Sequence, residues 1–123
     1  MHALSMKRVL ILSTERSTVH ALQSQLSEFE LHVLTDHHSF FETVRSYKPD
    51  VILIDFLLSE KNGGGICHQL KSDPSTNSYP VVLLSEFTDR PERFGCDAIV
   101  MKPFNGIELV QSIYQLLAMP KAG

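Results

Sequence analysis

The sequence predicts an α/β fold in which helices cover both faces of a five-stranded parallel sheet. Short apolar runs of four or five residues alternate along the chain with segments whose apolar residues recur at helical spacing, which is typical of a βαβ arrangement. The runs are apolar throughout, as expected for strands that are buried on both faces. A length of 123 residues suits one domain with a single core.

The five apolar runs differ in ways that predict their places in the sheet. The run 51–54 is the most hydrophobic and is expected at the centre, whereas the run 31–34 includes a histidine and is expected nearer an edge. The run 80–84 begins with a proline, which is tolerated at the first residue of a strand. The predicted strands are residues 9–12, 31–34, 51–54, 80–84 and 98–101.

Capping and helix-breaking residues delimit the predicted helices. Ser17 and Ser39 are placed to cap the first two helices. Pro49 ends the second helix, because a proline disfavours helical geometry in the residue before it. Asn105 and Glu108 form an N-cap and N3 pair of the capping-box type at the start of the last helix.

Two connections depart from the regular pattern. Glycines 63–65 follow the third strand but lack the GxxxxGK[ST] spacing of a phosphate-binding loop, so we interpret them as a loop that needs positive φ, with a short helix at 66–71. Only nine residues separate Ser85 from Gly95, and one of them is Pro91. The helix between the fourth and fifth strands is therefore expected to be short or absent.

Composition and charge narrow the classes of function. A net charge of −3 gives no global attraction to nucleic acid or to an anionic membrane, and we expect neither as a partner. The longest apolar run is far shorter than the ~20 residues that span a bilayer, and no secretory signal is visible. Cys67 and Cys96 form neither a CxxC motif nor a disulfide framework. We expect reduced thiols in a cytoplasmic protein.

Polar residues follow four of the predicted strands. Ser13 and Thr14 follow the first strand, Asp55 the third, Ser85 the fourth and Lys102 the fifth. The carboxyl ends of parallel strands converge on one crevice, where ligands bind in open α/β sheets. An acid, a hydroxyl and an amine gathered there predict a reactive site.

From Lys7 to Ala118 the chain resembles the receiver domain of two-component response regulators. Three features carry the resemblance: Asp55 after the third strand, Ser85 after the fourth, and Lys102-Pro103-Phe104 after the fifth. The resemblance implies a flavodoxin-like three-layer sandwich with strand order 2-1-3-4-5, and a cis bond before the proline. We expect a receiver-like domain over residues 7–118, flanked by flexible termini at 1–6 and 119–123.

The resemblance also implies a chemistry for the crevice. In the family, the residue at the place of Asp55 accepts a phosphoryl group from a histidine kinase, and a carboxylate is a serviceable nucleophile for that transfer. The ammonium of Lys102 and the hydroxyl of Ser85 would stabilise the negative charge that spreads over the phosphoryl oxygens during the transfer. A Mg²⁺ ion held by carboxylates normally completes such a site.

The chain departs from the family where the metal would bind. Ser13 and Thr14 stand where the family has a pair of acidic residues after the first strand. Without that pair, the charges of Asp55 and Lys102 sum to zero. Each lost carboxylate would have been worth ~4 kcal/mol toward a cation at ~4 Å and an effective dielectric near 20. Glu15 is one position too far along the chain to replace the pair without rearrangement.

Two further departures concern signalling. Ser59 takes the place of a family proline after the aspartate. Ile99 takes the place of an aromatic residue whose rotation couples to the hydroxyl on the fourth strand. An isoleucine has no polar group with which to make that switch. The expected loss of the helix before the fifth strand would remove part of the face through which receivers signal.

Simpler structural roles are the alternatives at these positions. Asp55 and Lys102 could form an inert salt bridge, and Ser85 could be an ordinary turn hydroxyl. The six histidines show no paired metal-ligand spacing, and most are expected at the surface. His37 and His38 follow the second strand near the rim of the predicted crevice, where a metal role is an alternative.

Three hypotheses for function follow. The preferred one is a degenerate receiver, not an enzyme, that contacts a histidine kinase or a downstream signalling protein with little or no Mg²⁺-dependent phosphorylation. It implies no cofactor. The second is a working phosphoacceptor that uses Asp55 with weak or unusual Mg²⁺ binding. The third, a flavodoxin-like enzyme or nucleotide binder, is disfavoured because no phosphate loop or catalytic pair is present.

Overall fold

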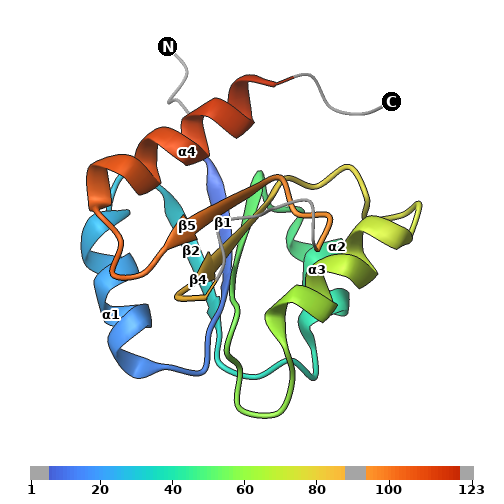
Figure 1. The fold of residues 1–123 in the computed structure, drawn as a ribbon. Helices are drawn as coiled ribbons and strands as arrows, with labels where there is room; N and C mark the ends of the chain where they lie inside the picture. Colours follow the sequence, from blue (N-terminus) through green and yellow to red (C-terminus); the bar gives the residue numbers. More distant parts are fainter. Residues whose placement is uncertain (1–5, 88–93, 120–123) are drawn as a thin grey trace.

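The computed structural model describes residues 6–87 and 94–119, and strands and helices alternate in it from the first strand to the fourth (Figure 1). The strands are β1 (Arg8–Leu12), β2 (Glu30–Leu34), β3 (Val51–Asp55), β4 (Val81–Ser85) and β5 (Ala98–Met101). The helices are α1 (Arg16–Gln25), α2 (Phe40–Tyr47), α3 (Gly63–Ser72) and α4 (Gly106–Ala118). All five predicted strands are present, with bounds shifted by at most one residue.

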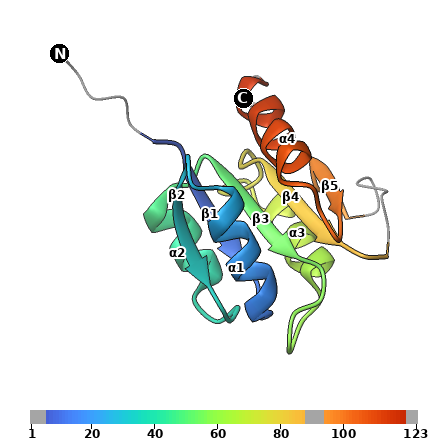
Figure 2. The same ribbon diagram turned by 90° about the vertical axis from the view of Figure 1, so that its left-hand side faces the viewer.

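The sheet is parallel throughout and has the order β2-β1-β3-β4-β5. Helices α1 and α4 cover one face and α2 and α3 cover the other, which gives three layers (Figures 1 and 2). The central strand β3 is buried along its whole length, whereas every residue of the edge strand β2 is at least partly exposed. The predicted fold class, strand order and placing of these two strands are confirmed.

Alternate residues of each strand enter two separate cores, one on each face of the sheet. In β1, Val9 and Ile11 pack with α1 and α4, while Leu10 and Leu12 pack with α2 and α3. All four side chains are fully buried. Burial of a side chain of this size stabilises a fold by about 1.5–3 kcal/mol. This two-sided packing fixes the strands and brings their carboxyl ends together at one edge.

The start of α1 differs from the prediction. The helix begins at Arg16 with Glu15 as its N-cap, so that Ser17 lies in the first turn and does not cap it. The backbone N–H of Glu15 donates a hydrogen bond to Ser13 Oγ at 3.2 Å, and Glu15 is extended at φ −97° and ψ 116°. A side chain that bonds a nearby backbone group in this way holds a turn, and the helix therefore starts earlier than predicted.

The predicted caps of α2 and α4 are in place, but only one of them makes its side-chain bonds. Ser39 is the N-cap of α2, yet at φ −104° and ψ 13° its backbone is not extended and its side chain forms no capping bond. Asn105 caps α4 with its side-chain oxygen, which accepts from the N–H of Ile107 at 2.8 Å and of Glu108 at 3.4 Å. The last helix therefore begins where the sequence predicts.

The glycine run after β3 forms the first turn of α3, so the prediction of a loop with positive φ is wrong. Asn62 is the N-cap, and its side chain accepts a hydrogen bond from the N–H of Gly64 at 2.7 Å. A Cβ atom at Gly63 would lie 2.1 Å from the carbonyl oxygen of Asp55. Close backbone approach is what requires glycine there. Among the glycines of the described residues, only Gly95 has positive φ, at 72°.

Some predictions fall on segments outside the described residues. The short or absent helix before β5 was predicted for residues 86–94, of which 88–93 lie outside the described part. The expected flexible termini at 1–6 and 119–123 also lie almost entirely outside it. The domain bounds 7–118 therefore stay a prediction. Within the described residues, no helix combines the length and the apolar character that a bilayer crossing requires.

Candidate crevice at the ends of the strands

Asp55 ends the central strand and lies at the bottom of the candidate site with 1% of its surface exposed. Its two carboxylate oxygens accept hydrogen bonds from different partners. Ser13 Oγ donates to Oδ2 at 2.9 Å, and Lys102 Nζ donates to Oδ1 at 2.6 Å. The flanking backbone is fixed by the adjacent strand, since the N–H of Phe56 donates to the carbonyl of Leu84 at 2.8 Å. The structure thus brings together three of the predicted site residues.

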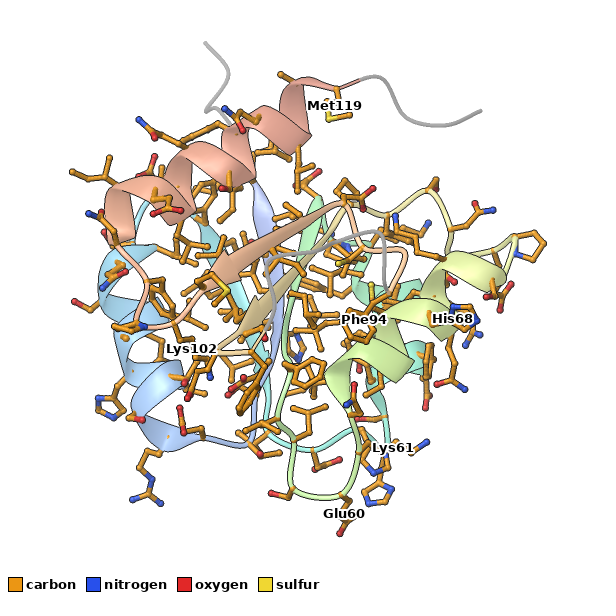
Figure 3. The ribbon with its side chains drawn as sticks, in the orientation of Figure 1. Glu60, Lys61, His68, Phe94, Lys102 and Met119 are labelled. Atoms are coloured by element: carbon orange, nitrogen blue, oxygen red, sulfur yellow. The ribbon has the colours of Figure 1, made fainter. Side chains whose placement is uncertain are left out.

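Lys102 follows β5 and points its amine into the crevice (Figure 3). Its backbone N–H donates to the carbonyl of Ser85 at 2.9 Å, which ties it to the end of β4. The Lys102–Pro103 peptide bond is cis, as the resemblance implied. Only 11% of the lysine side chain is exposed, and its Nζ also lies 3.3 Å from Thr18 Oγ1. A nearly buried ammonium of this kind needs such partners.

Glu15 is a member of the site that the sequence analysis placed too far away to replace the missing acids. Its carboxylate lies beside Lys102, with Oε1 3.6 Å from Nζ. Thr18 donates a hydrogen bond to the same oxygen. This hydrogen bond and the charge of Lys102 hold the pKa of Glu15 below its ordinary value. Counting only Asp55 and Lys102 therefore misses one negative charge.

Ser85 ends β4 with 1% of its surface exposed. Its Oγ accepts a hydrogen bond from the N–H of Phe87 at 3.0 Å. Together with Asp55, Lys102 and Glu86 it lines a small cavity of about 20 Å³. That volume holds roughly one water molecule. The three residues predicted to form a reactive site therefore share one cavity, and Glu86 adds an acid that the sequence analysis did not single out.

Ser13 and Thr14 have defined partners in the structure. Ser13 is fully buried and bonded to Asp55. The Oγ1 of Thr14 accepts a hydrogen bond from the backbone N–H of Ser59 at 3.1 Å, which joins the loop after β1 to the loop after β3. The two residues that replace the family's acidic pair thus connect the crevice walls through hydroxyl groups.

In this arrangement the carboxylate of Asp55 is held by donors of the protein itself. Mg²⁺ prefers octahedral oxygen ligands and is usually held by one or two free carboxylates. Both oxygens of Asp55 are already hydrogen-bonded, and the carboxylate of Glu15 faces the ammonium of Lys102. No group of three convergent ligand side chains within residues 6–87 and 94–119 includes Asp55. The donors present satisfy the buried carboxylate without a metal.

Comparison with curated proteins identifies partial relatives of the chain. Protein RcaC of Microchaete diplosiphon is 29% identical over 122 residues, which cover 94% of this chain and 19% of RcaC. The DNA-binding response regulator MtrA of Mycolicibacterium smegmatis is 31% identical over 114 residues, which cover 87% of this chain and 49% of MtrA. The chain therefore spans about half or less of the length of these relatives.

Solved structures share the fold. A putative response regulator from Chloroflexus aurantiacus superposes with a TM-score of 0.85 at 21% identity, covering 94% of this chain and 100% of its own. The receiver domain of a signal transduction histidine kinase from Syntrophus aciditrophicus gives a TM-score of 0.81 at 24% identity, covering 91% and 90%. The sequence profile of the response regulator receiver domain matches residues 9–114. The chain belongs to the response regulator receiver domain family.

Proposed function

We propose that this receiver domain is a degenerate member that signals by protein–protein contact without Mg²⁺-dependent phosphorylation. One observation carries the proposal: Ser13 Oγ donates to Asp55 Oδ2 at 2.9 Å where the family resemblance implies a metal-binding acid. The ammonium of Lys102 bonds the other oxygen at 2.6 Å. A carboxylate whose oxygens are both held by donors is less available as a nucleophile than a free one.

The electrostatic balance supports the same proposal. Phosphoryl transfer to a carboxylate brings two negatively charged groups together, and cations must offset their repulsion. Lys102 is the one basic side chain that lines the described cavity, and it already offsets Asp55 and part of Glu15. No cofactor is part of this proposal.

A protein partner, such as a histidine kinase or a downstream signalling protein, fits the surface around the crevice. Leu57 is 55% exposed, Phe87 is 64% exposed, and both line the cavity that contains Asp55. Exposed apolar side chains beside a functional residue favour recognition by another protein. We place this contact in the cytoplasm, since Cys67 and Cys96 form no disulfide bond.

The expected absence of a nucleic-acid partner is not supported by the relatives. MtrA is described as a DNA-binding response regulator, and the chain matches only 49% of it. The net charge of −3 belongs to these 123 residues alone and says nothing of a longer chain. We therefore restrict the proposal to protein contact by this domain and exclude nothing about a larger regulator.

A second candidate function is retained because Asp55, Ser85 and Lys102 line the same cavity. That juxtaposition favours a working phosphoacceptor in which Asp55 receives a phosphoryl group from a histidine kinase. It would require Ser13 and Lys102 to release or share the carboxylate oxygens as the new bond forms.

Intact-mass analysis distinguishes the two candidates. The protein is incubated with a small phosphodonor, with and without MgCl₂, beside Asp55→Asn and the double variant Ser13→Asp/Thr14→Asp. We expect no phosphoryl adduct on the wild type, and a Mg²⁺-dependent adduct on the double variant that disappears when Asp55→Asn is added. An adduct on the wild type but not on Asp55→Asn would establish the second candidate instead.

A further inference from the structure

Two histidines and a glutamate from separate loops converge away from the crevice. His37 and His38 lie between β2 and α2, and Glu60 lies between β3 and α3. One ligand atom from each of them lies within 4.8 Å of the others, and no other such group of three occurs in the described part of the chain. Figure 3 shows Glu60 at the lower end of the molecule, well apart from Lys102.

The separations suit a metal ion. Two ligands bound tetrahedrally to one ion at ~2.1 Å lie about 3.4 Å apart. Glu60 Oε2 lies 3.4 Å from His37 Nε2 and 3.7 Å from His38 Nε2. Only small rotations of exposed side chains would be needed to bring all three atoms to bonding distance.

The two imidazoles of His37 and His38 face the same carboxylate. Their ring centroids are 4.4 Å apart, and both rings direct Nε2 at the same oxygen of Glu60. Two imidazole nitrogens and a carboxylate oxygen that converge on one point form a set of ligands that a dication can bind.

Backbone hydrogen bonds hold both loops in place. The N–H of His38 donates to Asp36 Oδ1 at 3.0 Å, and the carbonyl of His37 accepts from the N–H of Phe40 at 3.2 Å. On the other side, the N–H of Leu58 donates to the carbonyl of Lys61 at 3.2 Å, which closes the turn that carries Glu60. The backbone positions of the three residues are thus set by the fold, which lowers the ordering cost of binding.

We propose that His37, His38 and Glu60 form a surface site for Zn²⁺, with the fourth tetrahedral position open to water or to a ligand from a partner. Imidazole nitrogen suits Zn²⁺, whereas Mg²⁺ prefers an all-oxygen set. The site is separate from the Asp55 crevice and does not depend on the proposed function. A bound Zn²⁺ ion would join the loop after β2 to the loop after β3. The loop after β3 is already connected to Thr14 through the N–H of Ser59.

Calorimetric titration of the protein with ZnCl₂ tests the site. We expect one saturable site in the wild type, and affinity at least about tenfold weaker in His38→Ala and in Glu60→Gln. His68→Ala is the matched control, because His68 is also exposed but lies on α3, apart from Glu60 (Figure 3). Absence of saturable binding below about 1 mM, or equal weakening in the control, would overturn the proposal.

A second measurement on the unmodified chain localises the metal. In ¹H–¹⁵N spectra, ZnCl₂ should shift amides of residues 36–39 and 58–61, and MgCl₂ at the same concentration should leave them unchanged. Shifts centred on Cys67 and Cys96 would show that the thiols bind the metal and would overturn the proposal. This measurement needs no variant, so a folding defect cannot obscure its result.

Discussion

At the scale of single residues, the buried pair of Asp55 and Lys102 dominates the energetics of the crevice. The exposed fraction of the two side chains is 1% and 11%. A buried ion pair adds little net stability over an apolar pair, but removal of one partner leaves a charge that neither water nor a counter-ion solvates. Replacing only one of the two residues should therefore cost more stability than replacing both with uncharged residues.

Replacing Lys102 by methionine should lower the free energy of unfolding by about 3–5 kcal/mol. The reason is that Asp55 would keep only the Ser13 hydroxyl as a partner while remaining buried. Urea denaturation of the variant at neutral pH measures the loss. The double variant Asp55→Asn/Lys102→Met should be more stable than Lys102→Met alone, and a double variant that is less stable would contradict this account.

Replacing Glu15 by glutamine should change the pH dependence of stability. The folded pKa of Glu15 lies below its ordinary value of 4.5, because of the Thr18 hydrogen bond and the charge of Lys102. The unfolded chain therefore takes up the proton first on acidification, so this stabilisation is present above about pH 4.5 and is lost as the pH falls through the folded pKa. The side chain is 53% exposed, which limits the effect to less than about 1 kcal/mol.

Thermal or urea unfolding of wild type and Glu15→Gln between neutral and acidic pH checks this sign. The difference in unfolding free energy should shrink as the solution becomes acidic. A difference that grows on acidification would show that Glu15 is not stabilised by Lys102 and Thr18.

Sequence patterns predicted some of these residue contacts and could not predict others. Asp55 and Lys102 were expected to meet because each directly follows a strand of one parallel sheet. The approach of Glu15 to Lys102 depends on where α1 begins, and a hydrogen bond from the Glu15 N–H to Ser13 Oγ determines that start. Such a local bond has no periodic signature in the sequence.

At the scale of an element, the start of α3 depends on how closely Gly63 approaches β3. Its N–H donates to the carbonyl of Phe56 at 2.8 Å, and a Cβ atom would lie 2.1 Å from the carbonyl oxygen of Asp55. Because the obstructing atom belongs to the backbone of the central strand, it cannot move without disturbing the crevice. Gly65, two residues on, has no atom within 4 Å of the same constructed position.

The matched substitutions Gly63→Ala and Gly65→Ala should therefore have opposite effects. Gly63→Ala should destabilise the protein by at least about 1–3 kcal/mol because the new methyl group overpacks a fixed site. Gly65→Ala should stabilise it by roughly 0.5–1 kcal/mol because alanine is the better helix former. Urea midpoints measure both changes, and equal effects would refute the role assigned to Gly63.

Local sequence patterns predicted the start of one helix and missed the start of another. Asn105 was predicted as the cap of α4 from its pairing with Glu108 three residues on, and the structure confirms Asn105 as the N-cap. Asn62 caps α3 in the same way but was missed, because the glycines after it were interpreted as a loop. The need for those glycines comes from a neighbouring strand and a neighbouring ring, that of Phe94 against Gly64. Local sequence patterns do not predict tertiary contacts of this kind.

At the scale of the whole molecule, the two cysteines lie inside the core between the sheet and α3. The exposed fractions are 0% for Cys67 and 7% for Cys96, and the two residues form no disulfide bond. A hydrogen bond to Cys96 and burial raise the pKa of Cys67 well above the ordinary thiol range. The same hydrogen bond lowers the pKa of Cys96, so burial is what should slow the reaction of both thiols with a reagent in solution while the fold is intact.

Thiol labelling should therefore report unfolding of the domain. An aromatic disulfide reagent should modify the native protein slowly and the denatured protein completely at both positions. The variant Ser24→Cys, on the exposed face of α1, supplies a matched thiol that should react at once. Rapid native labelling of Cys67 would show that α3 opens independently of the rest of the fold.

The arrangement of the sheet was predictable only in part from physical patterns. The hydrophobicity of the runs predicted β3 at the centre and β2 near an edge, since the central strand is shielded on all sides. The full order 2-1-3-4-5 came from the family resemblance, because apolar runs show that strands are buried but not which strands are neighbours. The order in turn places Asp55 between the loops that complete its crevice.

The hydroxyl of Ser13 on Asp55 has a consequence for how such a domain could carry information. If the domain signals by protein contact alone, as proposed, the state that its own side chains hold would not depend on cellular magnesium or on the supply of phosphodonors. Its output would then scale with the number of copies present, through mass action with its partner. Synthesis and degradation, and not covalent turnover, would set the strength of its signal.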